Sequence, residues 1–233
     1  MPRFAVCVFP GSNCEEDVRY ALQNVLGEPA DLVWHKESRL DGYDAAILPG
    51  GFAHGDYLRV GAIARFSPIM DSVRAMAETG KPVIGICNGF QMLQEAGLLP
   101  GAMLRNQSLT YICRYLYLRV ERTDSPMSQT LDEGEILRIP IGHADGNFYA
   151  DEETLTELER DSRVVFRYVN ESGERDEGAN PNGAAHAIAG ITNAHGNVVG
   201  LMPHPDRCYE PELGTADGRK LFESLVAWTK DRA

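Results

Sequence analysis

The sequence has few basic residues and no long apolar run, and both absences limit what the protein can bind. Its 22 Lys and Arg residues stand against 34 Asp and Glu residues, which gives a formal net charge of −12. This acidic balance argues against nonspecific binding to nucleic acid or to an anionic membrane surface. No stretch approaches the roughly 18 apolar residues that a membrane span requires. We therefore expect neither a nucleic-acid partner nor a membrane partner.

Paired cysteine spacing is also missing. The five cysteines are odd in number, scattered along the chain and without a Cys-x-x-Cys pair: Cys7, Cys14, Cys87, Cys113 and Cys208. This pattern predicts neither a disulfide framework nor a zinc site. The first residues do not follow the signal-peptide pattern, because a strand-like run begins at Phe4 and stops at Pro10. The expected location is the reducing cytoplasm.

Short apolar runs alternate with helical patterns through the first hundred residues. The runs end at Gly and Pro, as buried strands do. Strands are expected at 4–9, 30–35, 44–48 and 82–87. Helices are expected from a cap at Ser12 or Asn13 to Gly27, over 68–78, and from 88 to Gly97. Strands separated by helices predict a parallel sheet with helices on both faces.

The second half of the chain has a more antiparallel pattern. Strands are expected at 112–120, 136–139, 164–169, 187–192 and 198–202, the last two joined as a hairpin across 193–197. Helices are expected at 152–159 and 217–228. No repeat, low-complexity tract or linker interrupts the sequence. The prediction is one α/β domain over residues 1–233, with an open, mostly parallel central sheet, helices on both faces and a smaller antiparallel β layer.

Cys87 lies where a predicted strand changes abruptly into a helix, with Gly85 and Gly89 two residues to either side. Gly-x-Cys-x-Gly is the cysteine counterpart of the nucleophile elbow, in which glycines leave room for a tight, strained turn. The helix N-terminus would favour the thiolate of Cys87, and the backbone N–H of Asn88 would face a developing oxyanion. A buried core cysteine at a strand end is the alternative interpretation of Cys87.

A thiolate nucleophile needs a base, and His204 has the most informative setting among the histidines. It lies between Pro203 and Pro205, which should exclude a helix and hold the backbone extended. In an extended segment, the side chains of His204 and Asp206 share one side, so the carboxylate would fix the imidazole tautomer. A solvated histidine in a surface turn is the alternative.

Other polar positions are candidates for binding. Gly50 and Gly51 either let the chain leave a strand sharply or supply a second oxyanion N–H with Asn88, a donor typically worth about 10²–10³ in rate. Gln91, one turn into the elbow helix, either holds a polar substrate head or is a surface glutamine. His143 belongs to a polar cluster without a spacing argument. Because no serine has an elbow context, a serine hydrolase is not expected.

With these motifs, the sequence resembles the class I glutamine amidotransferases of the triad type. Within that family it is most similar to the glutaminase subunits of phosphoribosylformylglycinamidine synthase, an enzyme of purine biosynthesis. The resemblance extends over roughly residues 4 to 229 and is carried by Phe9 to Cys14, Leu48 to Arg59, Gly85 to Gln91, Asn180 to Gly183 and Gly200 to Pro205. The fold it implies is flavodoxin-like.

The resemblance implies a specific reaction. Cys87 would attack the side-chain amide of L-glutamine, His204 would accept and then donate the proton, and the backbone amides of Gly51 and Asn88 would stabilise the oxyanion. Gly50 and Gln91 are the candidate substrate-binding residues. Ammonia would pass to a large ATP-dependent synthetase that works with a small third subunit. The resemblance implies no cofactor or metal in this chain. ATP and Mg²⁺ would bind the synthetase, consistent with the absence of a Walker-type loop here.

One position departs from the family pattern. Asp206 stands where the third triad member is usually glutamate, and it is one methylene shorter, so it would reach His204 through a small backbone shift or through water. Two alternatives remain from the sequence. A peptidase or stress-response hydrolase on the same fold usually has a histidine after the cysteine, where Asn88 stands here. A non-enzymatic relic would be expected to have lost Cys87 or His204.

Overall fold

The computed structural model describes residues 1–232. Its strands are β1 (Phe4–Val8), β2 (Ala30–Trp34), β3 (Ala45–Leu48), β4 (Val83–Ile86), β5 (Ala102–Leu104), β6 (Ile112–Val120), β7 (Ile136–His143), β8 (Asn147–Tyr149), β9 (Val164–Val169), β10 (Ile188–Thr192) and β11 (Val198–Leu201). Its α-helices are α1 (Glu15–Tyr20), which continues as a π-helix (Ala21–Val25), α2 (Ile69–Glu78), α3 (Asn88–Glu95), α4 (Glu152–Arg160) and α5 (Asp217–Asp231).

A single large sheet organises the described part of the chain, with the strand order β2-β1-β3-β4-β11-β10-β9-β6-β7. The neighbours from β2 through β11 pair in parallel, and those from β11 through β7 pair antiparallel. The short strands β5 and β8 form a separate antiparallel pair. The predicted α/β class is therefore confirmed, and the antiparallel half extends the same sheet beyond β11.

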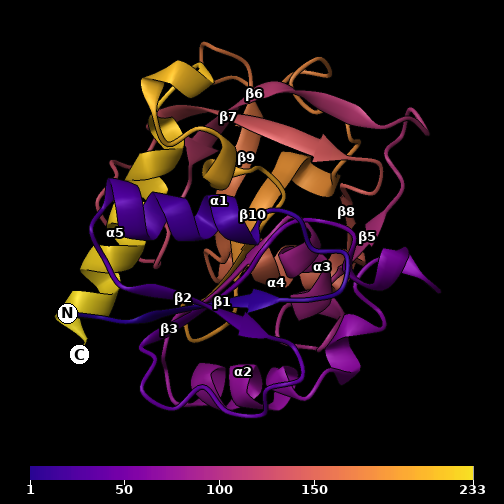
Figure 1. Cartoon of the computed structure of the whole chain (residues 1–233). Helices are drawn as coiled ribbons and strands as arrows, with labels where there is room; N and C mark the ends of the chain where they lie inside the picture. The colour runs from indigo at the N-terminus through magenta and orange to yellow at the C-terminus, as the bar shows by residue number, and fades with distance from the viewer. Residues whose placement is uncertain (233) are drawn as a thin grey trace.

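The helices cover both faces of this sheet. Across the sheet, the connection from β1 leads to the edge strand β2 on one side. The connections from β3 to β4 and onward to β11 lead in the opposite direction. Because crossovers between parallel strands are right-handed, α1 lies on the face opposite α2 and α3. Helix α5 packs beside the π-helix that continues α1, so it shares the face of α1. Figure 1 shows α1 and α5 on one side of the parallel strands and α2 on the other.

Apolar strands bury the centre of the sheet. Every residue of β3, β4, β9, β10 and β11 is buried, as expected for strands covered on both faces. The predicted hairpin of β10 and β11 is present, and Asn193 N–H donates to the Val198 carbonyl at 3.0 Å across its turn. Among residues 1–232, no helix combines the length and apolar character needed to cross a membrane.

The start of α1 differs from the prediction. Cys14 occupies the N-cap position, and no side chain caps the helix there. Ser12 instead turns back on its own loop, where its hydroxyl donates to the Phe9 carbonyl at 2.8 Å. The predicted cap at Ser12 or Asn13 was therefore wrong. The consequence is that the loop after β1 places Cys14, and not a capping hydroxyl, at the carboxyl edge of the sheet.

The strand-to-helix corner at Cys87 has the strained backbone that the glycine spacing predicts. Cys87 has φ 50° and ψ −107°, an unfavourable conformation for a residue with a side chain. A Cβ added at Gly89 would lie 1.9 Å from the Leu48 carbonyl oxygen, and one at Gly85 would lie 2.6 Å from the Gly89 carbonyl. The two glycines therefore allow α3 to press directly onto β3 and β4.

We predict that Gly89→Ala destabilises the protein by at least about 2 kcal/mol, because the new methyl group would force the first turn of α3 away from β3. The free energy of unfolding in urea measures this effect. Gly178→Ala is the matched control, since a Cβ there meets only the Asp176 carboxylate, at 3.3 Å. Equal stability of the two variants would contradict the proposed close packing.

Candidate active site

The loops that follow four adjacent strands meet around one cavity of about 360 Å³ at the carboxyl edge of the sheet. Cys14 comes from the loop after β1, Gly51 from the loop after β3, Cys87 from the corner after β4, and His204 from the loop after β11. Parallel sheets bind ligands at this edge, where the order of neighbouring strands reverses. Residues far apart in the sequence thus line the same small space.

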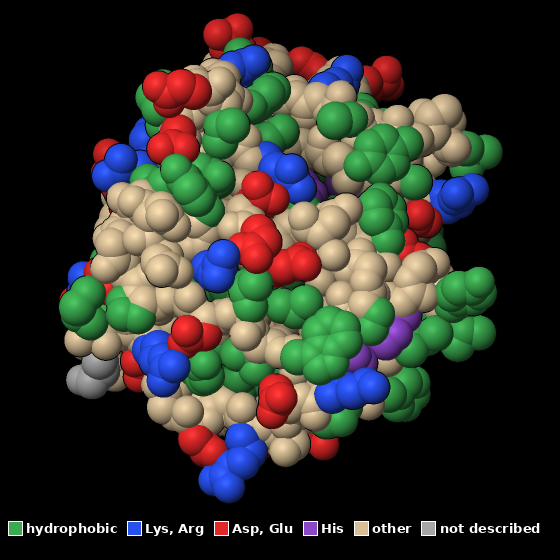
Figure 2. All heavy atoms as spheres, viewed as in Figure 1, with side chains coloured by type: hydrophobic (Ala, Val, Ile, Leu, Met, Phe, Trp, Pro, Cys, Tyr) green, Lys and Arg blue, Asp and Glu red, His purple; other side chains and the backbone are tan. Residues whose placement is uncertain are grey.

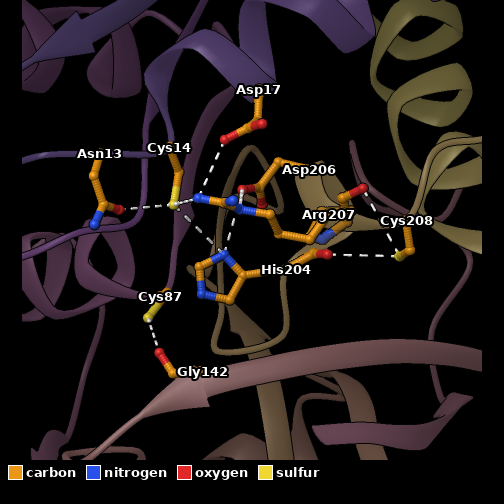
Figure 3. Close-up of polar contacts among 10 residues, drawn as sticks. Asn13, Cys14, Asp17, Cys87, Gly142, His204, Asp206, Arg207 and Cys208 are labelled. Atoms are coloured by element: carbon orange, nitrogen blue, oxygen red, sulfur yellow. Dashed lines mark hydrogen bonds and ion pairs between the residues drawn. The ribbon is translucent and has the colours of Figure 1, made fainter. Parts of the chain in front are cut away.

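Cys87 is held firmly at the base of this cavity. Its backbone N–H donates to the Leu201 carbonyl at 2.8 Å, and its carbonyl accepts from Phe90 N–H at 3.0 Å. Cys87 is only 5% exposed, and its Sγ lies 4.0 Å from the Gly142 carbonyl oxygen. The sulfur therefore has little freedom to move and faces the strand β7 side of the cavity (Figure 3).

His204 lies between Cys87 and a carboxylate. Its Nδ1 is 3.3 Å from Oδ2 of Asp206, and its other ring edge faces Cys87 in Figure 3. The expected extended backbone is absent, because Pro205 opens a short 3-10 turn over Pro205–Arg207. Proline is tolerated there, since the first position of a turn needs no N–H donor. Asp206 reaches the imidazole directly.

Charge around His204 controls its protonation. Burial by itself would lower the pKa of His204, but the negative charges of Asp206 and Cys87 outweigh it, and the pKa is raised well above its ordinary value. Hydrogen bonds to Asp206 and Cys14 act in the same direction. The environment therefore favours an imidazolium next to Cys87. A thiol, an imidazole and an orienting carboxylate in this order can perform nucleophilic catalysis.

The two predicted oxyanion donors come from the loop after β3 and from the first residue of α3. Gly51 lines the cavity, and Asn88 begins α3, where backbone N–H groups have no partner within the helix. The Asn88 side chain fixes the loop after β3: its Oδ1 accepts from Ala53 N–H at 3.0 Å, and its Nδ2 donates to Asp56 at 3.3 Å. Burial raises the pKa of Asp56 to about 6.

The two candidate substrate-binding residues have different surroundings. A Cβ at Gly50 would lie 2.6 Å from Cε1 of His204, so Gly50 gives the imidazole its space. Gln91 is buried, its Nε2 donates to the Asp145 carbonyl at 2.7 Å, and its Oε1 accepts from Asn88 at 2.9 Å. Both polar ends of Gln91 therefore already have protein partners, and substrate contact would require releasing one of them.

The sequence reasoning missed Cys14 and Arg207. Sγ of Cys14 lies 4.0 Å from Nδ1 of His204 and accepts from the Arg207 guanidinium at 3.2 Å. Arg207 also pairs with Asp17 at 3.2 Å. The available signal was the position of Cys14 directly after the first parallel strand, at the same edge as Cys87. Figure 3 shows these side chains gathered around one edge of His204.

His143 is a second buried histidine near the cavity. Its Nδ1 donates to Oδ1 of Asn106 at 3.2 Å, because an amide oxygen can only accept. Burial, followed by the charge of His204, lowers its pKa to about 4. His143 is therefore a neutral imidazole at physiological pH. His195, in contrast, lies exposed in the turn between β10 and β11.

The chain is similar to known proteins over nearly all its length. The family model of the CobB/CobQ-like glutamine amidotransferase domain matches residues 1–229. Phosphoribosylformylglycinamidine synthase subunit PurQ of Gloeobacter violaceus is 57% identical over 225 residues, 97% of each chain. The same-named subunit of Moorella thermoacetica is 54% identical over 97% of this chain and 96% of its own.

A solved structure agrees with this similarity. A chain in the structure of PurLQS from Thermotoga maritima superimposes with a TM-score of 0.86 at 42% identity, covering 97% of this chain and 98% of that chain. The similarity therefore includes the fold as well as the sequence, and it extends across both the parallel and the antiparallel halves of the sheet.

We predict that His143 makes the folded protein sensitive to acid. The unfolded chain takes up the proton near the ordinary pKa of 6.5 and the folded chain only near 4, so this stabilisation is present above pH 6.5 and is lost as the pH falls to 4. The full shift corresponds to about 3 kcal/mol. The free energy of unfolding in urea, measured at several pH values, should fall by about 3 kcal/mol less in His143→Gln than in the unsubstituted protein. The exposed control His195→Gln should lose as much stability as the unsubstituted protein. Parallel profiles for all three proteins would contradict the prediction.

Proposed function

The chain belongs to the family of CobB/CobQ-like glutamine amidotransferases, and from this membership we infer that it is the glutaminase subunit of phosphoribosylformylglycinamidine synthase. It hydrolyses L-glutamine to glutamate and ammonia. The ammonia serves the ATP-dependent conversion of formylglycinamide ribonucleotide to the amidine in purine biosynthesis. The observation that carries this inference is the strained Cys87 corner facing His204 in a chain that is more than half identical to such subunits.

The first step forms a thioester on Cys87. The raised pKa of His204 supports passage of the thiol proton to the imidazole, which leaves a thiolate to attack the glutamine side-chain carbonyl. The carbonyl π electrons move to oxygen, and the tetrahedral intermediate then expels the amide nitrogen. His204 returns its proton to that nitrogen, so that ammonia leaves. Water, deprotonated by His204, attacks the thioester, and glutamate leaves as Cys87 regains its thiol.

The oxyanion in both steps would receive the backbone N–H groups of Gly51 and Asn88. Gly51 lines the cavity together with Cys87, and Asn88 directly follows Cys87 at the start of α3, which supports this role. Asp206 acts by orienting His204, since its carboxylate accepts from the imidazole N–H and stabilises the imidazolium. Gly50 serves the substrate indirectly by giving that imidazole room. Gln91 would act through Asn88, which its side chain holds in place.

The partners are the large synthetase subunit and a small third subunit. Exposed apolar side chains support docking of these partners: Phe52, Tyr57, Leu58, Phe66, Leu109 and Tyr111. Phe52 and Tyr111 also line the cavity. Leu58 is 87% exposed and has φ 71°, an unusual conformation for a branched residue. Figure 2 shows hydrophobic side chains gathered on the right of the molecule, where Figure 1 places β5 and β8.

The chain itself needs no cofactor for this chemistry, because a thiolate and an imidazole supply both the nucleophile and the proton transfers. ATP and Mg²⁺ are assigned to the synthetase partner. The cytoplasm is the proposed location, in agreement with the biosynthetic role and with five unpaired cysteines.

The first test identifies nucleophile and substrate together. We expect an electrophilic glutamine analogue to label Cys87, and excess L-glutamine to prevent the labelling, with the adduct located by peptide mass spectrometry on the chain together with its synthetase. Cys113 is the internal control, because it is the exposed cysteine and lies at the cavity rim. Adducts spread over several cysteines would mean general thiol reactivity, and no adduct in the complex would rule out the glutaminase assignment.

The second test ranks the triad members. Cys87→Ser removes the nucleophile, and Asp206→Ala should reduce glutaminase kcat much less. The reason is that the 3.3 Å contact from Asp206 to His204 is long for a charge-assisted hydrogen bond. Asp206→Asn, which keeps the size of the side chain, separates loss of charge from loss of packing. Steady-state ammonia release in the presence of the synthetase measures all three variants. Equal, complete losses in Asp206→Ala and Cys87→Ser would contradict this ranking.

A further inference from the structure

Two potential metal ligands, Cys14 and Asp206, lie against the edge of His204 that faces away from Cys87, and that edge of His204 is a third. Sγ of Cys14, a ring nitrogen of His204 and a carboxylate oxygen of Asp206 all lie within 4.8 Å of one another, and all three residues are buried. The proposed glutaminase chemistry uses His204 and Asp206 but has no role for Cys14. The cluster therefore holds a second, unassigned thiol directly against the base of the reaction.

The donor set suits a borderline-soft divalent cation. Thiolate, imidazole and carboxylate are the ligands found around Zn²⁺, which keeps a fourth, open position in many protein sites. Bond lengths of about 2.0–2.3 Å in a tetrahedron place ligand atoms roughly 3–4 Å apart. The separations in this cluster are 4.0 Å from Cys14 Sγ to His204 Nδ1 and 3.3 Å from that nitrogen to Asp206 Oδ2. Small side-chain adjustments would complete the coordination.

The buried Asp206 carboxylate provides an independent indication that the cluster can accept a cation. Asp206 is 0% exposed, and among the described residues its Oδ1 has no hydrogen-bond partner. A buried carboxylate oxygen without a donor is costly, because it has lost its water without replacement. A cation bound to the carboxylate would offset this cost. This oxygen belongs to the same side chain that already faces Nδ1 of His204.

Arg207 is the competitor for this position. Its guanidinium donates to Cys14 Sγ at 3.2 Å, and its Nε lies 3.8 Å from Asp206 Oδ2. The side chain is 46% exposed and also reaches Asp17 at 3.2 Å, so it can withdraw toward Asp17 and solvent. The protein therefore neutralises the cluster with a movable arginine, and a metal ion would have to displace it.

We propose that Cys14, His204 and Asp206 form an inhibitory site for Zn²⁺. On binding, the Cys14 thiol and the Nδ1–H of the His204 imidazolium each release a proton to solvent. Cys14 then donates a sulfur lone pair, His204 donates the freed Nδ1 lone pair, and Asp206 donates a carboxylate oxygen. The one remaining proton of His204 then resides on Nε2, the edge facing Cys87. That nitrogen has no lone pair left to accept the Cys87 proton, so the bound ion blocks nucleophile activation, a consequence that rests on the proposed glutaminase function.

The site differs from simple poisoning of the nucleophile. A metal ion bound through Cys87 would use Nε2 and would not require Cys14 or Asp206. Binding must therefore be measured with Cys87 removed. The full chain carrying Cys87→Ser and Cys113→Ser leaves Cys14 as the cysteine that lines the cavity. Cys7 and Cys208 are buried and do not line it, and Cys208 Sγ donates to the His204 carbonyl at 3.5 Å.

The binding experiment uses Cd²⁺ alone as the probe and follows the ultraviolet thiolate-to-cadmium absorption together with calorimetric affinity. We expect one equivalent to bind to the double variant. Adding Cys14→Ser should abolish the absorption, and adding Asp206→Asn should weaken binding at least about tenfold, the scale that even outer-shell partners of a metal contribute. Adding Arg207→Gln should strengthen binding, because the competing cation is removed.

Loss of fold is checked for each variant by urea unfolding. Absorption that persists in the Cys14→Ser background, or that is absent from the double variant, would overturn the proposed site. Arg207→Gln binding more weakly than its parent would contradict the displacement of the arginine.

A separate activity measurement tests the consequence of binding. Zn²⁺ should inhibit ammonia release by the protein with its synthetase, and the inhibition constant should rise at least about tenfold in Cys14→Ser when each variant is normalised to its own metal-free rate. Cd²⁺ binding without any glutaminase activity would refute the proposed function alone. Full activity without Cd²⁺ binding would refute the metal site alone.

Discussion

The contact between the first turn of α3 and strand β3 is the constraint on which the site depends. Gly89 lies so close to the Leu48 carbonyl that no side chain fits between them. This contact draws the helix onto the sheet and forces Cys87 into its unfavourable backbone conformation. Packing energy from the buried strands β3 and β4 offsets that strain. The nucleophile is positioned by the core of the protein, and its loop neighbours only complete the cavity.

Much of this arrangement follows from local sequence. The apolar run up to Ile86, the helical spacing after Cys87 and the two flanking glycines are all contained in a few residues, so the corner could be predicted. The parallel strands could be predicted for the same reason, because each is a short apolar run closed by turn residues. The strands β5 and β8 were missed because each is three residues long and has too little pattern to detect.

The residues that surround His204 could not be predicted from local sequence. Cys14 and His204 are 190 residues apart, and their proximity depends on the lateral order of β1, β3, β4 and β11. Sequence indicates that each strand exists, but the order comes from packing of helices on both faces. The direct contact of Asp206 with His204 likewise depends on the 3-10 turn at Pro205, which a pair of prolines suggested would be extended.

The shorter carboxylate explains why His204 has room for a second kind of partner. Asp206 reaches Nδ1 at 3.3 Å, whereas a charge-assisted hydrogen bond is typically about 2.7–2.9 Å. The remaining gap is bordered by the Cys14 thiol and filled at its outer side by Arg207. A proton and a metal ion both compete for the same Nδ1 lone pair. His204 uses Nδ1 to hold its orientation and Nε2 to transfer the catalytic proton. The cation bound at Nδ1, a proton or a metal ion, therefore determines whether Nε2 can accept the proton of Cys87.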